Sequence, residues 1–370
     1  MTNQRESASS RLVLQLGPPP GSQGGMASVL ETYQELPLKD HEFEFSSTWA
    51  PTDRFKGLGP TLASAGRLVG SRWRRRQEAR PIAHLHMSEG GSFIREGGLA
   101  LLAHTLGLGV VTSMHGADLR PFVLEHPRLV ATVLGRVDAV LALGPGTADL
   151  LAPYTSGRAR VCVIANPVEM PAEVTPAGDT PPRVVFGGEI GRRKGVDVLL
   201  EAWSAVRDAV PDAELIIAGP PGDIEPREVD GVRWLGPVER TSIGTLVEGA
   251  RVAVLPSRQE VMPMFLLEAM SRARPIVTTD VGEIRQLVSD PATLLEPGDA
   301  AGLAHQLITL LRNPGSATAA GDLLRERVAG RFSPAVVAAQ LEELYDSIGI
   351  APGSSADPTS SASVSGAATP

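Results

Sequence analysis

Residues 252–280 read VAVLPSRQEVMPMFLLEAMSRARPIVTTD, and this stretch decides the fold. An apolar run, VAVLP, is followed by a helical pattern at 264–273 and then by a second apolar run, PIVTT. Short and continuously apolar runs are typical of strands that are buried on both faces of a parallel sheet. Parallel neighbours need a crossover between them, most often a helix. The stretch therefore predicts a β-α-β unit.

The same alternation extends outward along most of the chain. Further strand candidates are residues 11–16, 43–49, 81–87, 110–115, 139–143, 160–165, 183–188, 214–219 and 232–236. Other helical patterns cover 26–36, 93–106, 121–134, 196–206 and 301–311. Strands that alternate with helices predict the α/β class, with doubly wound parallel sheets covered by helices on both faces.

A proline-rich, polar stretch, MPAEVTPAGDTPP at 170–182, interrupts this alternation and is predicted to be a linker. A chain of 370 residues also exceeds what one compact core usually supports. Ser333 and Pro334 favour the start of a final helix. We therefore predict an N-terminal Rossmann-like, acceptor-binding domain (1–169), the linker, a C-terminal Rossmann-like, donor-binding domain (183–332), a crossover helix (333–349) and a disordered tail (350–370).

Composition narrows the class of protein. The formal net charge of -8 argues against a general nucleic-acid binder, which would normally be basic. The single cysteine, Cys162, excludes an internal disulfide framework and favours a reducing compartment. The first ten residues, MTNQRESASS, have no apolar core of a signal peptide. These observations predict a cytoplasmic protein.

Two carboxylates flank the start of the helix in the deciding stretch. Glu260 follows VAVLP, beyond the carboxyl end of a strand, where ligands bind in open α/β sheets. Glu268 lies in the helix. A helix N-terminus suits an anion such as phosphate, and carboxylates suit sugar or ribose hydroxyls. The amides predicted to be available are those of Val261, Met262, Met264 and Phe265. In the alternative interpretation, Glu260 is a solvated loop residue and Glu268 complements the helix dipole.

A second segment, FGGEIGRRKG at 186–195, follows another predicted strand. Gly187 and Gly188 allow close approach of the backbone. Lys194 opens a helix, and a cation at that point can neutralise a departing diphosphate. The alternative is that Arg192, Arg193 and Lys194 form only a solvated turn.

At these two segments the sequence resembles the retaining glycosyltransferases of family 4, which have the GT-B fold. EVMPMFLLEAM at 260–270, followed by ARPIVTTDVGE at 273–283, resembles the signature that holds the sugar nucleotide. The resemblance implies that Glu268 binds the nucleotide ribose and Glu260 the hydroxyls of the transferred sugar. Val261 stands where the family has glycine.

The segment at 186–195 resembles the family's phosphate clamp, which uses an arginine and a lysine. Lys194 and Gly195 match, but Glu189 occupies the place of the arginine. A carboxylate cannot clamp a phosphate, so either Arg192 or Arg193 supplies the second cation, or Glu189 points away and pairs with one of them.

The first half carries weaker motifs. GSQGGMAS at 21–28 places Gly24 and Gly25 before a helix, where the family commonly has two glycines facing the diphosphate. SMHGADL at 113–119 resembles a family segment whose histidine, here His115, lies near the transferred sugar. A structural role is the alternative for His115. The remaining histidines, among them His84 and His86, are predicted to be structural or exposed.

These residues define a predicted site without a metal, since the chain has no D-x-D and no zinc-ligand spacing. No cofactor is expected beyond the nucleoside diphosphate sugar donor. The predicted catalytic residues are His115, Lys194 and Glu260. The predicted donor-binding residues are Gly24, Gly25, Arg193, Lys194, Glu260, Met262, Met264 and Glu268.

The arginines between Arg67 and Arg80, grouped around Trp73, suggest contact with an anionic membrane surface and a lipid-linked acceptor. The alternative is a solvated basic helix. The predicted function is metal-independent transfer of a sugar to an acceptor hydroxyl with retention, in polysaccharide, glycolipid or glycoconjugate synthesis. The rival functions are an inactive relative that acts as a binding subunit and a sugar-nucleotide epimerase.

Overall fold

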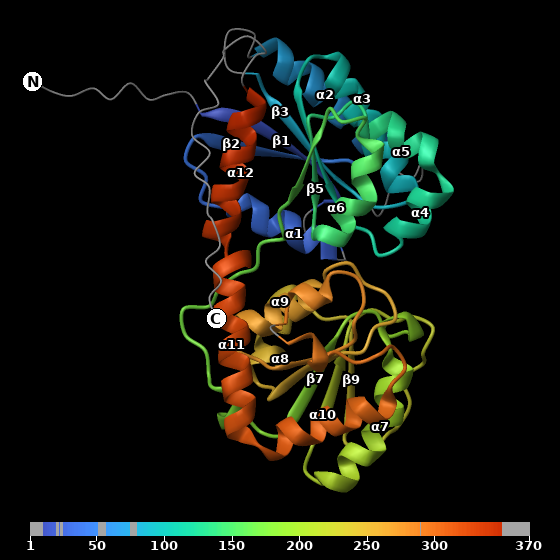
Figure 1. Ribbon diagram of the computed structural model, residues 1–370, viewed down its shortest axis with the longest axis vertical. Helices are drawn as coiled ribbons and strands as arrows, with labels where there is room; N and C mark the ends of the chain where they lie inside the picture. The colour runs from blue at the N-terminus through green and yellow to red at the C-terminus, as the bar shows by residue number, and fades with distance from the viewer. Residues whose placement is uncertain are drawn as a thin grey trace, which may run out of the picture.

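The computed structural model describes residues 10–19, 22, 25–50, 57–74, 80–288 and 290–349. The predicted tail at 350–370 lies outside these residues, as do Gly24 and residues 75–79. Figure 1 shows two α/β units, one above the other, with two helices running in line along one side of both. The predicted α/β class is confirmed.

The first unit is built on a six-stranded sheet with the order β2-β1-β3-β4-β5-β6. All of its neighbouring strands are parallel. The strands are β1 (Arg11–Gly17), β2 (His41–Ser47), β3 (Ile82–Met87), β4 (Gly109–Met114), β5 (Ala139–Ala142) and β6 (Arg160–Val163). β1, β3, β4 and β5 consist almost entirely of buried residues, which is why their sequences are continuously apolar rather than alternating.

The second unit has a five-stranded parallel sheet with the order β11-β10-β7-β8-β9. Its strands are β7 (Arg183–Gly187), β8 (Glu214–Ala218), β9 (Val232–Gly236), β10 (Val252–Leu255) and β11 (Ile276–Thr278). The chain extends from β7 in both directions across the sheet, so the order reverses between β7 and β10. Ligands of doubly wound folds bind at such a reversal.

The helices that cover the first sheet are α1 (Gly25–Gln34), α2 (Leu58–Arg74), α3 (Gly91–Thr105), α4 (Leu119–Glu125), α5 (Pro127–Leu134) and α6 (Pro145–Leu151). The second sheet carries α7 (Val196–Ala209), α8 (Arg240–Glu248), α9 (Met264–Ser271), α10 (Ala300–Arg312) and α11 (Pro314–Phe332). The single helix predicted at 121–134 is wrong. His126 adopts a non-helical conformation before Pro127, because proline disfavours helical geometry in the residue that precedes it.

The last helix, α12 (Pro334–Gly349), runs back to the first unit. Its buried side chains include Leu341, Leu344 and Tyr345, which join the same apolar cluster as Val13 and Tyr33 of the first unit. That cluster continues into the second sheet, so buried apolar contacts connect the two units.

Candidate active site

A buried ion pair lies at the point where the order of the second sheet reverses. Lys194 follows β7 and donates a hydrogen bond to the Glu260 carboxylate, which follows β10. Ser257 Oγ donates a second hydrogen bond to Glu260, at 2.8 Å. The side chains of Lys194 and Glu260 are only 15% and 6% exposed. Desolvation offsets much of the attraction in a charged pair withdrawn from water in this way, so the pair is weak evidence for stability and marks a candidate functional site.

Gly195 brings the two charges together. Its φ of +76° belongs to the left-handed region that glycine adopts readily. A Cβ atom at Gly195 would lie 1.9 Å from the carbonyl oxygen of Pro256, so any side chain would force the segment after β7 away from the loop after β10. The Lys-Gly pair of the sequence therefore has a local reason: lysine supplies the cation and glycine permits its approach to Glu260.

The loop that carries Glu260 is held from the other side by Gly282. This glycine has a φ of +57°, and a Cβ atom there would lie 2.2 Å from the Glu260 carbonyl oxygen. The next amide, of Glu283, donates to the Val261 carbonyl oxygen at 2.8 Å. Two segments that lie far apart in the sequence thereby fix the backbone at Glu260.

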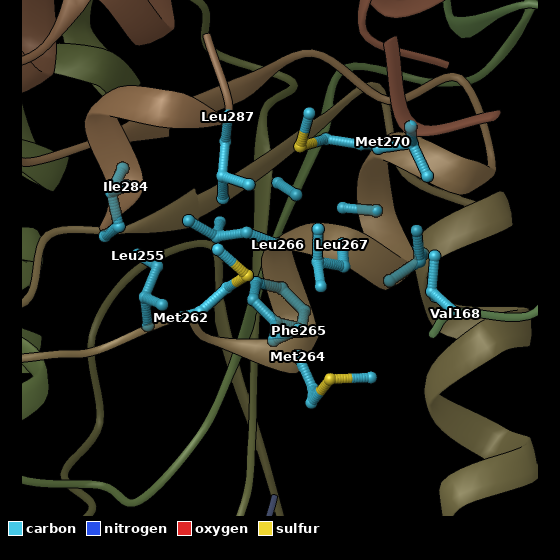
Figure 2. Close-up of a cluster of buried hydrophobic side chains, with 14 of the residues drawn as sticks. Val168, Leu255, Met262, Met264, Phe265, Leu266, Leu267, Met270, Ile284 and Leu287 are labelled. Carbon is cyan, nitrogen blue, oxygen red and sulfur yellow. The ribbon is translucent and has the colours of Figure 1, made fainter. Parts of the chain in front are cut away.

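Helix α9 is anchored by apolar side chains on almost every side. Figure 2 shows Met262, Met264, Phe265, Leu266, Leu267 and Met270 packed among Leu255, Ile284, Leu287 and Val168. Phe265 also fills the space beside Gly187, where a Cβ atom would lie 2.3 Å from its ring. This packing fixes the direction of the α9 N-terminus.

Two helix N-termini face one another between the units. Gly25, the first residue of α1, lies opposite Met264, the first residue of α9, with 4.0 Å between the position of a Gly25 Cβ and the Met264 Cγ atom. Within the described part of the chain, no hydrogen bond is formed by the backbone amides of Val261, Met262 and Met264. Two such N-termini make a favourable environment for an anion.

The two arginines beside Lys194 are engaged elsewhere. Arg193 forms an ion pair with Glu189 at 3.6 Å, and both side chains are partly exposed. Arg192 is 70% exposed and lies 3.7 Å from Asp197 and 3.8 Å from Asp223. Of the two arrangements left open by the sequence, the structure has the one in which Glu189 pairs with a neighbouring arginine.

Glu268 lies one turn along α9 from Met264 and lines a cavity of about 790 Å³ between the two units. The cavity is also lined by Glu31, Thr32, Gln34, Glu35, Val168, Glu169, Met170, Thr241, Gly244, Arg272 and Pro334. Because these lining residues come from α1, the linker, α8 and α9, both units enclose the cavity that Glu268 faces.

His115 directly follows β4 and is 9% exposed. Burial lowers its pKa to about 4, so the imidazole is neutral at pH 7. Its Nε2 atom lies 3.0 Å from Nδ1 of His86. In the loop after His115, the carbonyl oxygen of Ala117 accepts a hydrogen bond from Gln259 at 3.0 Å, which brings this loop to the loop of Glu260.

Four residues with a place in this arrangement were missed by the reasoning from sequence: Gln15, His84, His86 and Glu283. The sequence held a signal for three of them, since Gln15 interrupts the apolar run LVLQL and His84 and His86 alternate within the apolar strand IAHLHM. The two histidines are buried, as a structural role requires, and they form hydrogen bonds with Ser113, Gln15 and His115. Glu283 had no such signal, because its partner, Thr147, comes from a distant segment.

The structure thus brings Lys194, Glu260, Met262, Met264 and Gly25 to one place between the units and puts Glu268 on an adjoining wall. Arg193 is turned toward Glu189. Gly24 lies outside the described residues. Among the described residues, no group of three His, Cys, Asp or Glu side chains could hold a metal ion. In the same part of the chain, no helix combines the length and the apolar character needed to cross a bilayer.

A family model described as "Glycosyl transferases group 1" matches residues 181–313, which extend from β7 to the end of α10. Alpha-maltose-1-phosphate synthase of Mycolicibacterium smegmatis is 31% identical over 314 residues, or 72% of this chain and 79% of the relative. Phosphatidyl-myo-inositol mannosyltransferase of Mycobacterium leprae is 32% identical over 171 residues. The latter match spans 42% of this chain and 44% of that relative, and the match to glycogen synthase of Mycobacterium tuberculosis spans 50% of that relative.

Solved structures share the fold over most of the chain. Anabaena HepE, solved with UDP, has a TM-score of 0.68 at 16% identity and is matched over 91% of this chain and 100% of its own. Sucrose-phosphate synthase of Thermosynechococcus elongatus has a TM-score of 0.66 at 17% identity, over 91% of this chain and 99% of its own. At such low identity the likeness establishes the architecture alone.

Proposed function

The chain belongs to the group 1 family of glycosyl transferases and has the GT-B architecture, and we propose that it transfers a sugar from a nucleoside diphosphate sugar to an acceptor hydroxyl, with retention of anomeric configuration. The observation that carries the proposal is the buried Lys194–Glu260 pair at the reversal of the second sheet, beside the N-terminus of α9. Retention is adopted from the family that the sequence resembles.

The leaving group of this reaction is a diphosphate, and the pair explains how the site would receive it. The phosphate oxygens would draw the Lys194 ammonium away from Glu260 and would bind the free amides that precede α9. The N-terminus of α1 at Gly25 would complete the positive surroundings from the other unit. Glu260, released from Lys194, would accept hydrogen bonds from the hydroxyls of the transferred sugar. The charge of the leaving group needs no protein-bound metal in this proposal.

The nucleoside part would extend along α9, where the Glu268 carboxylate would accept hydrogen bonds from ribose hydroxyls. The acceptor would enter from the first unit, on the side of His115. Closure of both units around the donor would exclude water and limit hydrolysis of the donor. Relatives named for phosphatidyl-inositol mannosylation, maltose-1-phosphate synthesis and glycogen synthesis support a product that is a glycolipid, polysaccharide or other glycoconjugate.

One observation favours a second candidate, an inactive relative that binds the sugar nucleotide without turnover. Glu189 ties Arg193, the cation expected at the phosphates, into an ion pair. Val261 adds to this argument, since its side chain stands where the family has glycine. A sugar-nucleotide epimerase is the third candidate and would return an altered donor.

One experiment separates the three. The full chain is incubated with UDP-, GDP- and ADP-sugars, with and without a panel of sugar and lipid-linked acceptors, and the released nucleotide is measured. Release that depends on an acceptor, together with a product whose anomeric signals in NMR match those of the donor, is the expected result. Isomerised donor without release would indicate the epimerase. Binding in a titration without release would indicate the inactive relative.

We also propose that the first unit docks on the inner face of an anionic membrane through α2. Leu58, Leu62, Val69 and Trp73 lie on one face of that helix and are 55%, 63%, 40% and 65% exposed. A continuous apolar stripe in water marks an interaction surface. Arg67 and Arg72 use their guanidinium groups to bind the carbonyl oxygens of Phe45 and Leu106, so the apolar stripe supports the proposal more than the basic residues do.

Cosedimentation with phosphatidylglycerol vesicles tests the membrane proposal, with phosphatidylcholine vesicles for comparison. We expect the wild type to bind the anionic vesicles, and the double variant Leu62→Gln, Trp73→Gln to stay in the supernatant. Leu323→Gln is the matched control, because Leu323 is a 53% exposed leucine on α11 of the other unit. Equal binding of the wild type and the double variant would refute this role of α2.

A further inference from the structure

The interior of the first unit contains a row of polar side chains that ends at His115. His84 and His86 are two residues apart on β3 and therefore lie on one face of the sheet. β4 pairs with β3 so that Ser113 is opposite His86, and His115 follows on the same side. The rings of His84 and His86 stack with centroids 4.5 Å apart, and those of His86 and His115 with centroids 5.2 Å apart.

Resting on the proposed function, we propose that Gln15, His84 and His86, together with Tyr345 of α12, hold His115 in one neutral tautomer that carries its proton on Nε2. In that tautomer the Nδ1 lone pair of His115 remains available to accept a hydrogen bond from a hydroxyl of the sugar. His86 is then a positioning residue for the transfer reaction, and Tyr345 connects the crossover helix to the site.

The direction of each proton follows from the bonds. Nδ1 of His84 lies 2.7 Å from the Tyr345 hydroxyl and 3.3 Å from the amide nitrogen of Gln15, so it is an acceptor. His84 consequently carries its proton on Nε2 and donates to Ser113 Oγ at 2.7 Å. The Gln15 amide, turned this way, presents Oε1 to His86 Nε2 at 2.5 Å.

His86 therefore donates from Nε2 to Gln15 and has an unprotonated Nδ1. That atom lies 3.0 Å from His115 Nε2, so the proton between the two rings belongs to His115. No described residue forms a hydrogen bond with His115 Nδ1. The row leaves His115 one free acceptor and no free donor, which suits a hydroxyl and disfavours an anionic group such as a carboxylate or phosphate.

The row depends on the three imidazoles being neutral. Burial and repulsion from His115 lower the pKa of His84 to about 3, and burial with repulsion from both neighbours lowers the pKa of His86. A protonated ring would carry hydrogen on both nitrogens and would leave two donors facing each other. At pH 7 each ring therefore has one proton. Tyr345 and Gln15 determine which nitrogen of His84 carries it, and the tautomers of His86 and His115 follow from that choice.

A spectroscopic experiment tests the tautomer without any need for activity. Long-range ¹H–¹⁵N NMR spectra of the full chain, labelled with ¹⁵N-histidine, report which ring nitrogen of each histidine is protonated, and His115→Gln identifies the His115 signals. We expect an Nε2–H tautomer for His115 in the wild type, and a mixture of tautomers in His86→Phe, whose ring has no acceptor. An Nδ1–H tautomer in the wild type, or an unchanged one in His86→Phe, would overturn the proposal.

Kinetics then test whether the tautomer matters for transfer. His86→Asn keeps an oxygen acceptor near the position of Nδ1, whereas His86→Phe removes it. We expect His86→Phe to lower kcat/KM roughly 10- to 100-fold and His86→Asn to recover most of that loss. Thr112→Val is the matched control, because Thr112 is equally buried in β4 and its hydroxyl bonds to no described residue.

Equal kcat/KM for the two His86 variants and Thr112→Val would show that the row is only structural and would refute the positioning role. A wild type that turns over no donor, while the NMR spectra still show the predicted tautomer, would refute the proposed function and leave the tautomer assignment standing. The two failures are therefore distinguishable.

Discussion

Glu189 stands where the family's phosphate clamp has an arginine, and it holds Arg193 in a partly exposed ion pair of 3.6 Å. If that pair competes with donor phosphate, Glu189→Gln should release Arg193 and lower the KM for the donor several-fold, with a steeper dependence of KM on salt. Initial rates over a range of donor and salt concentrations measure this. Glu214→Gln is the control, because Glu214 pairs with Arg183 far from the site. A higher KM in Glu189→Gln would mean that Glu189 itself helps to bind the donor.

Single residues also show how much of the candidate site could be predicted from the sequence. The places of Lys194, Glu260, Met264 and Glu268 after a strand or on a helix could be predicted, because each lies in a short motif with a characteristic spacing. Their roles in donor binding stay predictions. The partner of Glu189 could not be chosen between Arg192 and Arg193, since both lie within reach in sequence. The directions of the side chains in the turn at 192–194 select Arg193 as the partner of Glu189. Arg192 is turned away because it pairs with Asp197 and Asp223.

Helix α11 crosses the back of α9 with almost no space between them. A Cβ atom on Gly321 would lie 2.0 Å from the carbonyl oxygen of Ala273, whereas one on Gly330 would meet nothing within 4 Å. Gly321→Ala should therefore lower the free energy of unfolding by about 1–3 kcal/mol through overpacking. Gly330→Ala in the same helix should raise it by about 0.5–1 kcal/mol through helix propensity. Urea denaturation of both variants checks the pair, and equal effects would contradict the packing argument.

The sequence prediction lacked α11, whereas the apolar runs located each of the eleven strands found in the described residues. The buried positions of α11 are Ala317, Gly321, Leu324, Val328 and Phe332, at helical spacing. Two of these five are alanine and glycine, so the apolar stripe is weak. The close approach of α11 to Ala273 requires these small residues. This requirement comes from tertiary packing, which a local sequence pattern does not reveal.

The buried histidines of β3 and of the residue after β4, His115, give the folded chain a pH-dependent stability. In the folded chain the pKa of His84 is lowered to about 3 and that of His115 to about 4, from an ordinary value of 6.5. Between pH 6.5 and about 4 the unfolded chain binds protons that the folded chain does not, so stability is full above this window and falls as pH is lowered through it. The urea midpoint should fall accordingly.

His84→Gln should make that fall shallower than in the wild type, because one suppressed proton site is gone. His305→Gln is the control, since His305 is an exposed histidine on α10. Chemical denaturation of the three proteins between pH 7.5 and pH 4 gives the comparison. Parallel curves for the wild type and His84→Gln would show that the buried histidines do not govern the acid loss.

Polar contacts as well as apolar ones connect the two units. Glu283 of the second unit is 4% exposed and accepts hydrogen bonds from Thr147 N at 2.6 Å and from Thr147 Oγ1 at 2.8 Å, at the start of α6. Gln259 bonds to Ala117 and Asp118 of the first unit. Because a carboxylate at a helix N-terminus is also favoured by the helix dipole, this contact should stabilise the packing of the two units against each other.

Glu283→Ala combined with Gln259→Ala should therefore increase the radius of gyration of the unliganded chain in small-angle X-ray scattering. Saturating donor should reverse the change, since the donor would bridge the units. Glu296→Ala is the control, because Glu296 is exposed on the second unit. The same scattering curve for the double variant and the wild type would show that these contacts do not hold the two units together.

The whole architecture was largely predictable, and the contacts between its halves were not. Alternating strands and helices indicated two doubly wound sheets, and the Ser333-Pro334 start located the helix that returns to the first unit. Glu283 and Gln259 of the second unit find partners in the first unit that lie 136 and 142 residues away along the chain. Sequence patterns report local periodicity, whereas these hydrogen bonds depend on how the two folded units pack against each other.

We expect the donor diphosphate to bind at Lys194, between the two helix N-termini. Acceptor-dependent release of nucleotide at saturating donor, compared between the wild type and Lys194→Met, tests this expectation most directly, with circular dichroism to confirm that both are folded. We expect Lys194→Met to lose roughly 100- to 1,000-fold in kcat. Arg192→Ala, which removes an exposed arginine two residues away, should retain turnover. A folded Lys194→Met protein with the kcat of the wild type would show that the diphosphate does not depend on Lys194.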